Sequence, residues 1–221
     1  MALSPDQAAR FIRDNTALIA PPHVPEIALH LADEAHDLWQ RTEEELDAIG
    51  LQPPFWAFAW AGGQGLARYV LDNPDVVQGR RVLDFASGSG LVGIAAARAG
   101  AAQVLASDID PFCAAAIALN AKESGVAIDF TDRDVVGEAG DWDVVLAGDV
   151  FYDQAFAARL VPWLSALRAR GSLVLLGDPG RYYLPKSGLT ALATYQVKVT
   201  RALEDAEVKK TTVWRMDEGI S

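Results

Sequence analysis

The feature that most constrains the fold is an apolar run at residues 82–85 that contains Asp84 and leads into a loop of small residues, 86–90. A helical pattern begins at Leu91, and a second apolar run stops at Asp108. Strands that alternate with helices predict a parallel sheet. The small loop lets a ligand approach the backbone, and Asp108 is placed to accept hydrogen bonds from ribose hydroxyls. The pattern predicts a cleft for a charged nucleoside.

Two classes of cofactor fit this loop. Residues 88–93 match the dinucleotide pattern G-x-G-x-x-G literally, but Asp84 would repel the pyrophosphate that such a loop holds. S-adenosylmethionine instead carries an ammonium and a sulfonium, which a nearby acid favours. The order of strand, Asp, small loop, helix, strand and Asp resembles the class I methyltransferases, so we favour S-adenosylmethionine. The remaining alternative is a plain strand–helix turn, which needs no Asp108.

The rest of the chain predicts an α/β fold: a doubly wound, seven-stranded, mostly parallel Rossmann-like sheet with an antiparallel last strand and an N-terminal helical cap. A short connection between the final two strands indicates a hairpin at the sheet edge. The expected strands are 81–85, 103–107, 127–131, 143–148, 172–177, 193–200 and 208–215, and the expected helices are 65–71, 91–99, 112–123 and 154–169.

Residues 1–52 read as an N-terminal helical segment, followed by a methyltransferase domain over 53–221, and the two form one structural unit. Ser4 is a candidate N-cap with Pro5 at the first helical position. A second helix is expected from Glu26, with one apolar face formed by Ile27, Leu31, Ala35 and Leu38.

Composition narrows the classes of partner. The 221 residues carry a net charge of −11 without a basic stripe, which argues against nucleic-acid binding. No apolar run is long enough to span a bilayer. The single Cys113 and three histidines at non-ligand spacing predict no metal site. We expect a cytoplasmic protein, because the N-terminus resembles neither a secretory signal nor a transit peptide and the single cysteine fits a reducing compartment. We also expect a monomer.

Asp149 and Tyr152 are the candidate catalytic residues. They follow the apolar run 144–147, at the edge of the sheet where ligands bind in open α/β folds. Asp149 would accept a hydrogen bond from a substrate amine and fix its direction, and Tyr152 would support it. The alternative is that Asp149 caps the helix beginning near Gln154, although Asp153 lies closer to that helix.

Three motifs carry a resemblance to a known family: Asp149-x-x-Tyr152, the loop 84–90, and an aromatic segment with Trp56, Trp60 and a glycine pair. Together they resemble the seven-strand protein-lysine methyltransferases of the methyltransferase-like sixteen family. The sequence of residues 146–152 and 177–185 is most similar to the branch that methylates the β subunit of electron transfer flavoprotein. Some bacterial members of that branch are labelled predicted nicotinamide N-methylases.

The resemblance implies roles for residues around the cofactor. Asp108 would hold the ribose, Gly88 would lie against the methionine moiety, and Trp60 and Gly63 would close over the cofactor. Asp134 would lie near the adenine amino group, with Asp132 as its rival. The complete set of implied cofactor residues is Trp60, Gly63, Asp84, Ala86, Gly88, Gly90, Asp108, Ile109, Asp134 and Ala147. Trp56 and Trp60 have an equal alternative as core residues.

The function that follows is S-adenosylmethionine-dependent methylation of a protein lysine, with the β subunit of electron transfer flavoprotein as the expected partner. Lysine must lose its proton before it attacks. A dry cleft with aromatic walls lowers the lysine pKa by desolvation, whereas Asp149 would raise it, so Asp149 is expected to position the amine and not to act mainly as a strong base. Two other classes stay open: a small-molecule N-methyltransferase acting on a nicotinamide-like amine, and a cofactor-binding module without catalysis. The segment 178–181 is expected to shape the substrate channel, or else to form a tight turn.

Overall fold

The computed structural model describes residues 4–32, 53–199 and 207–218, and its centre is a seven-stranded sheet. The strand order is β5-β4-β3-β6-β7-β9-β8, and every neighbouring pair is parallel except those that involve β9. The strands are β3 (Arg81–Phe85), β4 (Gln103–Ser107), β5 (Asp129–Thr131), β6 (Val144–Gly148), β7 (Leu173–Asp178), β8 (Leu189–Lys198) and β9 (Val208–Met216). The predicted antiparallel last strand is confirmed, and it lies between β7 and the edge strand β8.

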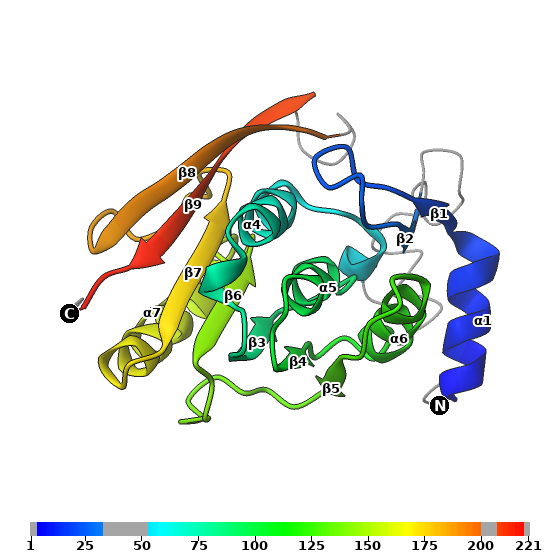
Figure 1. Ribbon diagram of the computed structural model, residues 1–221, viewed down its shortest axis with the longest axis horizontal. Coiled ribbons are helices and arrows are strands. Elements are labelled where there is room, and N and C mark those ends of the chain that lie inside the picture. Colours follow the sequence, from blue (N-terminus) through cyan, green and yellow to red (C-terminus); the bar gives the residue numbers. More distant parts are fainter. Residues whose placement is uncertain (1–3, 33–52, 200–206, 219–221) are drawn as a thin grey trace.

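Helices cover both faces of the sheet, which confirms the doubly wound class (Figure 1). On one face lie α4 (Ala61–Asp72), α5 (Leu91–Arg98) and α6 (Cys113–Glu123), and on the other lies α7 (Gln154–Ala169). The strand residues alternate accordingly. Val82 and Val144 pack in the cluster with α4 and α5, whereas Leu83 and Val145 pack in the cluster with α7. Short 3-10 turns occur at η1 (Phe55–Ala57) and η2 (Pro74–Val76).

The N-terminal cap is only partly the predicted one. Helix α1 (Pro5–Asn15) has the expected Ser4 cap and packs on α6. The helix predicted from Glu26 is wrong for the residues that the structure describes, because Ala17–Ile19 (β1) and Leu29–Leu31 (β2) pair as an antiparallel ribbon. Leu29 and Leu31 are both buried with His30 half-buried between them, which is a strand period of two. The remainder of that prediction, including Ala35 and Leu38, lies outside the described residues.

Helix α4 begins four residues earlier than predicted, since the glycine pair lies inside its first turn. Glycines in α4, β6 and β7 allow the start of α4 to lie close to the ends of these two strands. A Cβ on Gly177 would overlap the carbonyl oxygen of Gly62 and come within 2.8 Å of Leu66 Cβ. A Cβ on Gly148 would lie 2.8 Å from Gly63 Cα. The helix N-terminus is therefore pressed directly against the carboxyl edge of the sheet.

We predict that Gly177→Ala lowers the free energy of unfolding by about 1–3 kcal/mol or more, since α4 must move to admit the methyl group. Gly63→Ala is the matched control. Its Cβ would meet only Val92 Cγ2 at 3.9 Å, and alanine in a helix is favoured over glycine by roughly 0.5–1 kcal/mol. Urea unfolding of both variants measures the difference, and equal stabilities would contradict the close packing of α4.

Candidate functional site

The loop between β3 and α5 is organised by the buried carboxylate of Asp84. Its Oδ2 accepts a hydrogen bond from the backbone N–H of Gly93 at 2.8 Å and one from the Ser87 hydroxyl. This close approach requires glycine at position 93, because a Cβ there would lie 2.9 Å from the same oxygen. Asp84 therefore ties the loop to the first turn of the helix that follows it.

Burial dominates the ionisation of Asp84. It raises the pKa of this carboxyl to about 7, and the charge of Asp108 adds to that rise, while the bonds from Ser87 and Gly93 lower it. The group consequently changes charge near neutral pH. A cation bound beside it would favour the ionised form.

Asp108 stands at the end of β4 and faces the same loop. Its Oδ2 accepts a hydrogen bond from the N–H of Gly88 at 2.8 Å, and its Oδ1 accepts one from the N–H of Asp110 at 3.0 Å. The two strand-end acids thus lie on either side of the glycine loop, as the sequence pattern predicts. Asp110 is itself partly buried, and this burial raises its pKa to about 6.

Asp149 follows β6 and lies against the N-terminus of α4. Its side chain is 9% exposed, and its Oδ2 accepts a hydrogen bond from the N–H of Gly63 at 3.1 Å. Trp60, the residue at the N-cap of α4, makes no side-chain capping bond, so Asp149 takes that place from a distant part of the chain. The alternative that Asp149 caps α7 is wrong, because Asp153 caps it through the N–H of Phe156 at 2.8 Å.

The loop after β7 places a guanidinium on Asp149. Arg181 Nη2 lies 2.8 Å and Nε 3.2 Å from Asp149 Oδ1. The Arg181 Cζ is 5.9 Å from the centroid of the Trp60 ring. Asp178 fixes the loop by accepting hydrogen bonds from the N–H groups of Gly180 and Arg181 at 2.6 and 2.7 Å. The turn predicted for 178–181 is thus present, and it holds a charge at the candidate site.

Aromatic side chains form an exposed rim next to these residues. Tyr152 is 59% exposed, and its ring centroid lies 6.3 Å from that of Phe55, whose ring is 5.8 Å from that of Trp60. Burial of part of its ring, together with the charges of Asp108 and Asp153, raises the pKa of Tyr152. The hydroxyl therefore keeps its proton at neutral pH and stays available as a donor. Trp56, by contrast, is buried and stacks on Phe112, so it is a core residue.

The other predicted cofactor residues are spread over the same sheet edge. Gly88 and Gly90 adopt left-handed backbone with φ of 53° and 84°, and Ala86 does so with φ of 52°. Ile109 is 74% exposed. The Ala147 side chain lies in the core cluster with α7, so a ligand could reach this residue only through its backbone.

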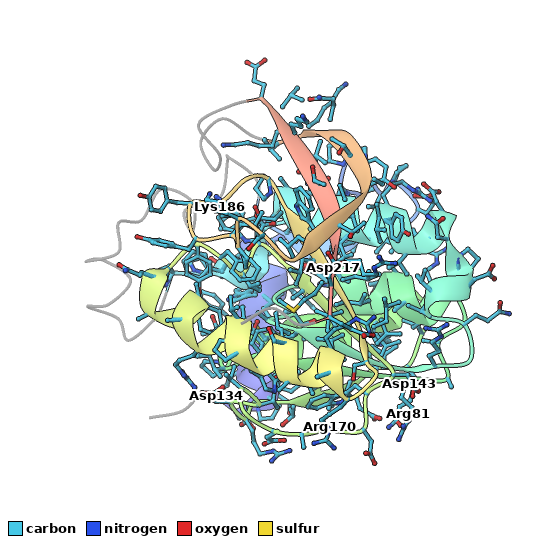
Figure 2. All side chains as sticks on the ribbon, turned by 90° about the vertical axis from the view of Figure 1, so that its left-hand side faces the viewer. Arg81, Asp134, Asp143, Arg170, Lys186 and Asp217 are labelled. Carbon is cyan, nitrogen blue, oxygen red and sulfur yellow. The ribbon has the colours of Figure 1, made fainter. Side chains whose placement is uncertain are left out.

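The two candidates for the adenine contact differ in their surroundings. Asp134 accepts a hydrogen bond from Arg159 Nη2 at 2.6 Å, and that ion pair lowers the pKa of its carboxyl. Figure 2 shows Asp134 beside α7, the helix that carries Arg159. Asp132 is exposed on the loop after β5. Asp134 therefore already has a structural partner in Arg159, whereas Asp132 faces solvent.

Sequence reasoning missed two contacts that hold the site together. The direct pairing of Arg181 with Asp149 joins residues 32 positions apart, and no local pattern encodes it. Asn120 is fully buried in α6, donates to the Ser89 carbonyl at 2.8 Å and accepts from the His30 N–H at 2.7 Å. A polar residue inside the apolar stretch of that helix was the available signal.

Among the residues that the structure describes, no group of three or more His, Cys, Asp or Glu side chains is arranged to hold a metal ion. Within the same described ranges, the helices also include none with the length and apolar character needed to cross a membrane.

Comparison with known proteins identifies close relatives of the whole chain. The family model of ribosomal protein L11 methyltransferase (PrmA) matches residues 66–150. The electron transfer flavoprotein beta subunit lysine methyltransferase of Xenopus laevis is 39% identical over 94% of this chain and 86% of its own length. The proteins of the same name from Danio rerio and Homo sapiens are 38% and 36% identical, over 96% and 92% of this chain and 84% and 80% of their own lengths.

Solved structures share the fold at low identity. A ribosomal protein L11 methylase from Lactobacillus delbrueckii aligns with a TM-score of 0.53 at 18% identity, over 73% of this chain and 81% of that one. Magnesium protoporphyrin IX methyltransferase from Synechocystis with bound S-adenosylmethionine gives 0.53 at 14%, over 84% and 100%. With relatives this similar along nearly its whole length, the chain belongs to the family of electron transfer flavoprotein β-subunit lysine methyltransferases, and it is a methyltransferase whose cofactor is S-adenosylmethionine.

Proposed function

We propose that this methyltransferase modifies a lysine side chain on the β subunit of electron transfer flavoprotein. The observation that carries the proposal is the 39% identity to an enzyme of that name over 94% of the chain. The site agrees with an amine substrate, because a buried carboxylate and an exposed aromatic rim lie side by side at the sheet edge.

The residues on the cofactor side fit a sulfonium-bearing nucleoside. The loop 86–90 would present backbone and small side chains to the ligand, and the acids Asp84 and Asp108 flank this loop. Each carboxylate oxygen of Asp108 accepts one hydrogen bond from a backbone N–H. Each oxygen has a second lone pair that can accept a hydrogen bond from a ribose hydroxyl. When bound, S-adenosylmethionine supplies the electrophilic methyl group. We assign Asp108 to the ribose, and Asp84 and the loop to the charged methionine end.

The chain's own part in the transfer is orientation. In such a transfer the lysine nitrogen would bond to the methyl carbon, and the electron pair of the broken carbon–sulfur bond would go to sulfur. A proton then leaves the substituted nitrogen for water. Asp149 accepts a hydrogen bond from the attacking amine and aims its lone pair, and Tyr152 borders the aliphatic stem of the lysine with its ring. Such orientation raises the effective concentration of the two reacting groups.

The direct test uses purified enzyme, labelled S-adenosylmethionine and purified β subunit of electron transfer flavoprotein from the same organism. We expect label in the protein band, and mass spectrometry should place it on lysine. A parallel incubation with cell extract covers other substrates. Label confined to small molecules would overturn the proposal in favour of a small-molecule N-methyltransferase, and an absence of any transfer would favour a binding module.

Two substitutions should separate positioning from cofactor binding. Asp149→Asn keeps a side chain that tolerates left-handed backbone, and we expect methylation to fall by about a hundredfold because the amine is misdirected. Affinity for S-adenosylmethionine should stay near that of wild type. Asp108→Ala should do the reverse and weaken binding by about ten- to a hundredfold through lost charge-assisted hydrogen bonds. Calorimetry and initial rates measure both, and turnover that survives in Asp149→Asn contradicts the assignment.

The buried carboxyl of Asp84 predicts a pH-dependent affinity. Below its folded pKa of about 7 the group is neutral and gives no attraction to a cation, whereas above 7 it is ionised. Binding of S-adenosylmethionine should therefore tighten as pH rises through 7, by at most about tenfold per pH unit. S-adenosylhomocysteine keeps the α-ammonium but lacks the sulfonium charge, so comparing the two ligands shows which cation responds. Calorimetry from pH 5.5 to 8.5 is run on wild type and Asp84→Asn; the affinity should rise with pH in the wild type alone, and equal pH profiles in the two proteins would exclude this role for Asp84.

A further inference from the structure

Arg181 is held in place from three directions. Its backbone N–H donates to Asp178 Oδ1 at 2.7 Å, its guanidinium donates twice to Asp149 Oδ1 at 2.8 and 3.2 Å, and its Cζ lies 5.9 Å from the centre of the Trp60 ring. Each contact comes from a different part of the chain: β7, the end of β6 and the start of α4. A side chain that only adds surface charge does not need to be fixed by three such contacts, so the position of this guanidinium matters.

The pair that Arg181 forms with Asp149 is largely shielded from water. The side chains are 24% and 9% exposed, so the attraction between them is screened less than that of an ion pair in bulk solvent. The second carboxylate oxygen of Asp149 accepts from Gly63 N–H in the first turn of α4, where the helix dipole is positive. Asp149 is thus held by two positive groups. Its carboxylate oxygens keep lone pairs that can direct a further hydrogen-bond donor.

An unpaired carboxylate at this position would act against methyl transfer. A lysine side chain has a pKa of about 10.4 in water, and an opposite charge nearby favours its protonated form. The ammonium has no lone pair to attack a methyl group. A guanidinium beside the carboxylate cancels that preference, because a like charge disfavours a second cation.

We propose that Arg181 is a positioning residue that offsets the charge of Asp149, so that the target amine is received as a free base already aimed along the hydrogen bond to the carboxylate. This inference rests on the proposed function, since it takes the substrate to be a lysine amine. Arg181 touches Asp149 and acts through it. The methyl-transfer step itself is unchanged by the proposal.

The other titratable groups that the structure describes at this sheet edge are the same in every Arg181 variant. Asp178 comes from the end of β7, Tyr152 and Asp153 from the loop of Asp149 itself, and Asp84 and Asp108 from the cofactor side. Helix α4 contributes an N–H group and the uncharged Trp60 ring. A difference between pH profiles of the variants therefore reports the charge at position 181.

The test compares wild type with Arg181→Lys and Arg181→Gln. Lysine keeps the positive charge, and glutamine keeps a hydrogen-bond donor for Asp149 without charge. Single-turnover methylation of the β subunit of electron transfer flavoprotein, at saturating S-adenosylmethionine, is measured from pH 6.5 to 9.5. We expect the acid limb of the rate to move to higher pH by about one unit in Arg181→Gln. In Arg181→Lys the limb should keep its wild-type position, with a smaller loss of rate.

Two results would overturn this role for Arg181. One is a profile of Arg181→Gln that lies below the wild-type profile by the same factor at every pH, which is what a merely structural contact gives. The other is a glutamine variant as fast as wild type. Thermal unfolding and S-adenosylmethionine binding verify that each variant is folded, and Arg181→Met replaces a glutamine variant that is not. Failure of the wild-type enzyme to label any protein would instead count against the proposed function, so the two failures are distinguishable.

Discussion

The close contact between α4 and the carboxyl ends of β6 and β7 underlies the rest of the site. Glycine at 62, 148 and 177 lets helix and sheet backbones approach to a distance at which any side chain would collide. That approach brings the first N–H groups of the helix to the strand edge, where Asp149 accepts a hydrogen bond from Gly63. It also brings Trp60 under Arg181. Without this contact, the substrate side and the cofactor side of the sheet edge would not be held at a fixed distance from each other.

Two carboxylates at the same edge lie in different environments. Asp84 is enclosed by protein, and burial raises its pKa to about 7. Asp149 is nearly as buried and, like Asp84, accepts a hydrogen bond from a helix N-terminus, but it also faces the guanidinium of Arg181. Enzymes commonly assign different roles to similar acids by such differences of surroundings. Here the difference agrees with a titrating acid on the cofactor side and a carboxylate paired with a guanidinium on the amine side.

Much of this could be predicted from local sequence, because strand and helix periods and small loops are local properties. The strands around Asp84 and Asp108 and the helix cap at Asp153 are examples. The ribbon at Leu29 and Leu31 could not be predicted, since an apolar alternation over three residues is too short to outweigh an apolar pattern spaced by four. The pairing of Arg181 with Asp149 was missed for a different reason: it depends on which loops the strand order β6-β7 makes neighbours.

The backbone at Asp149 explains why the residue after β6 serves α4 and not its own helix. Its φ of 59° is left-handed, a conformation that aspartate tolerates better than most residues. Its N–H donates to the Gly177 carbonyl at 2.9 Å, which extends the pairing of β6 with β7 by one residue beyond the strand. The turn directs the carboxylate toward Gly63 and Arg181, while Asp153 takes the cap of α7. One strained residue thereby separates two tasks, a structural cap and an oriented acceptor, that a regular strand–helix loop would have placed on one side chain.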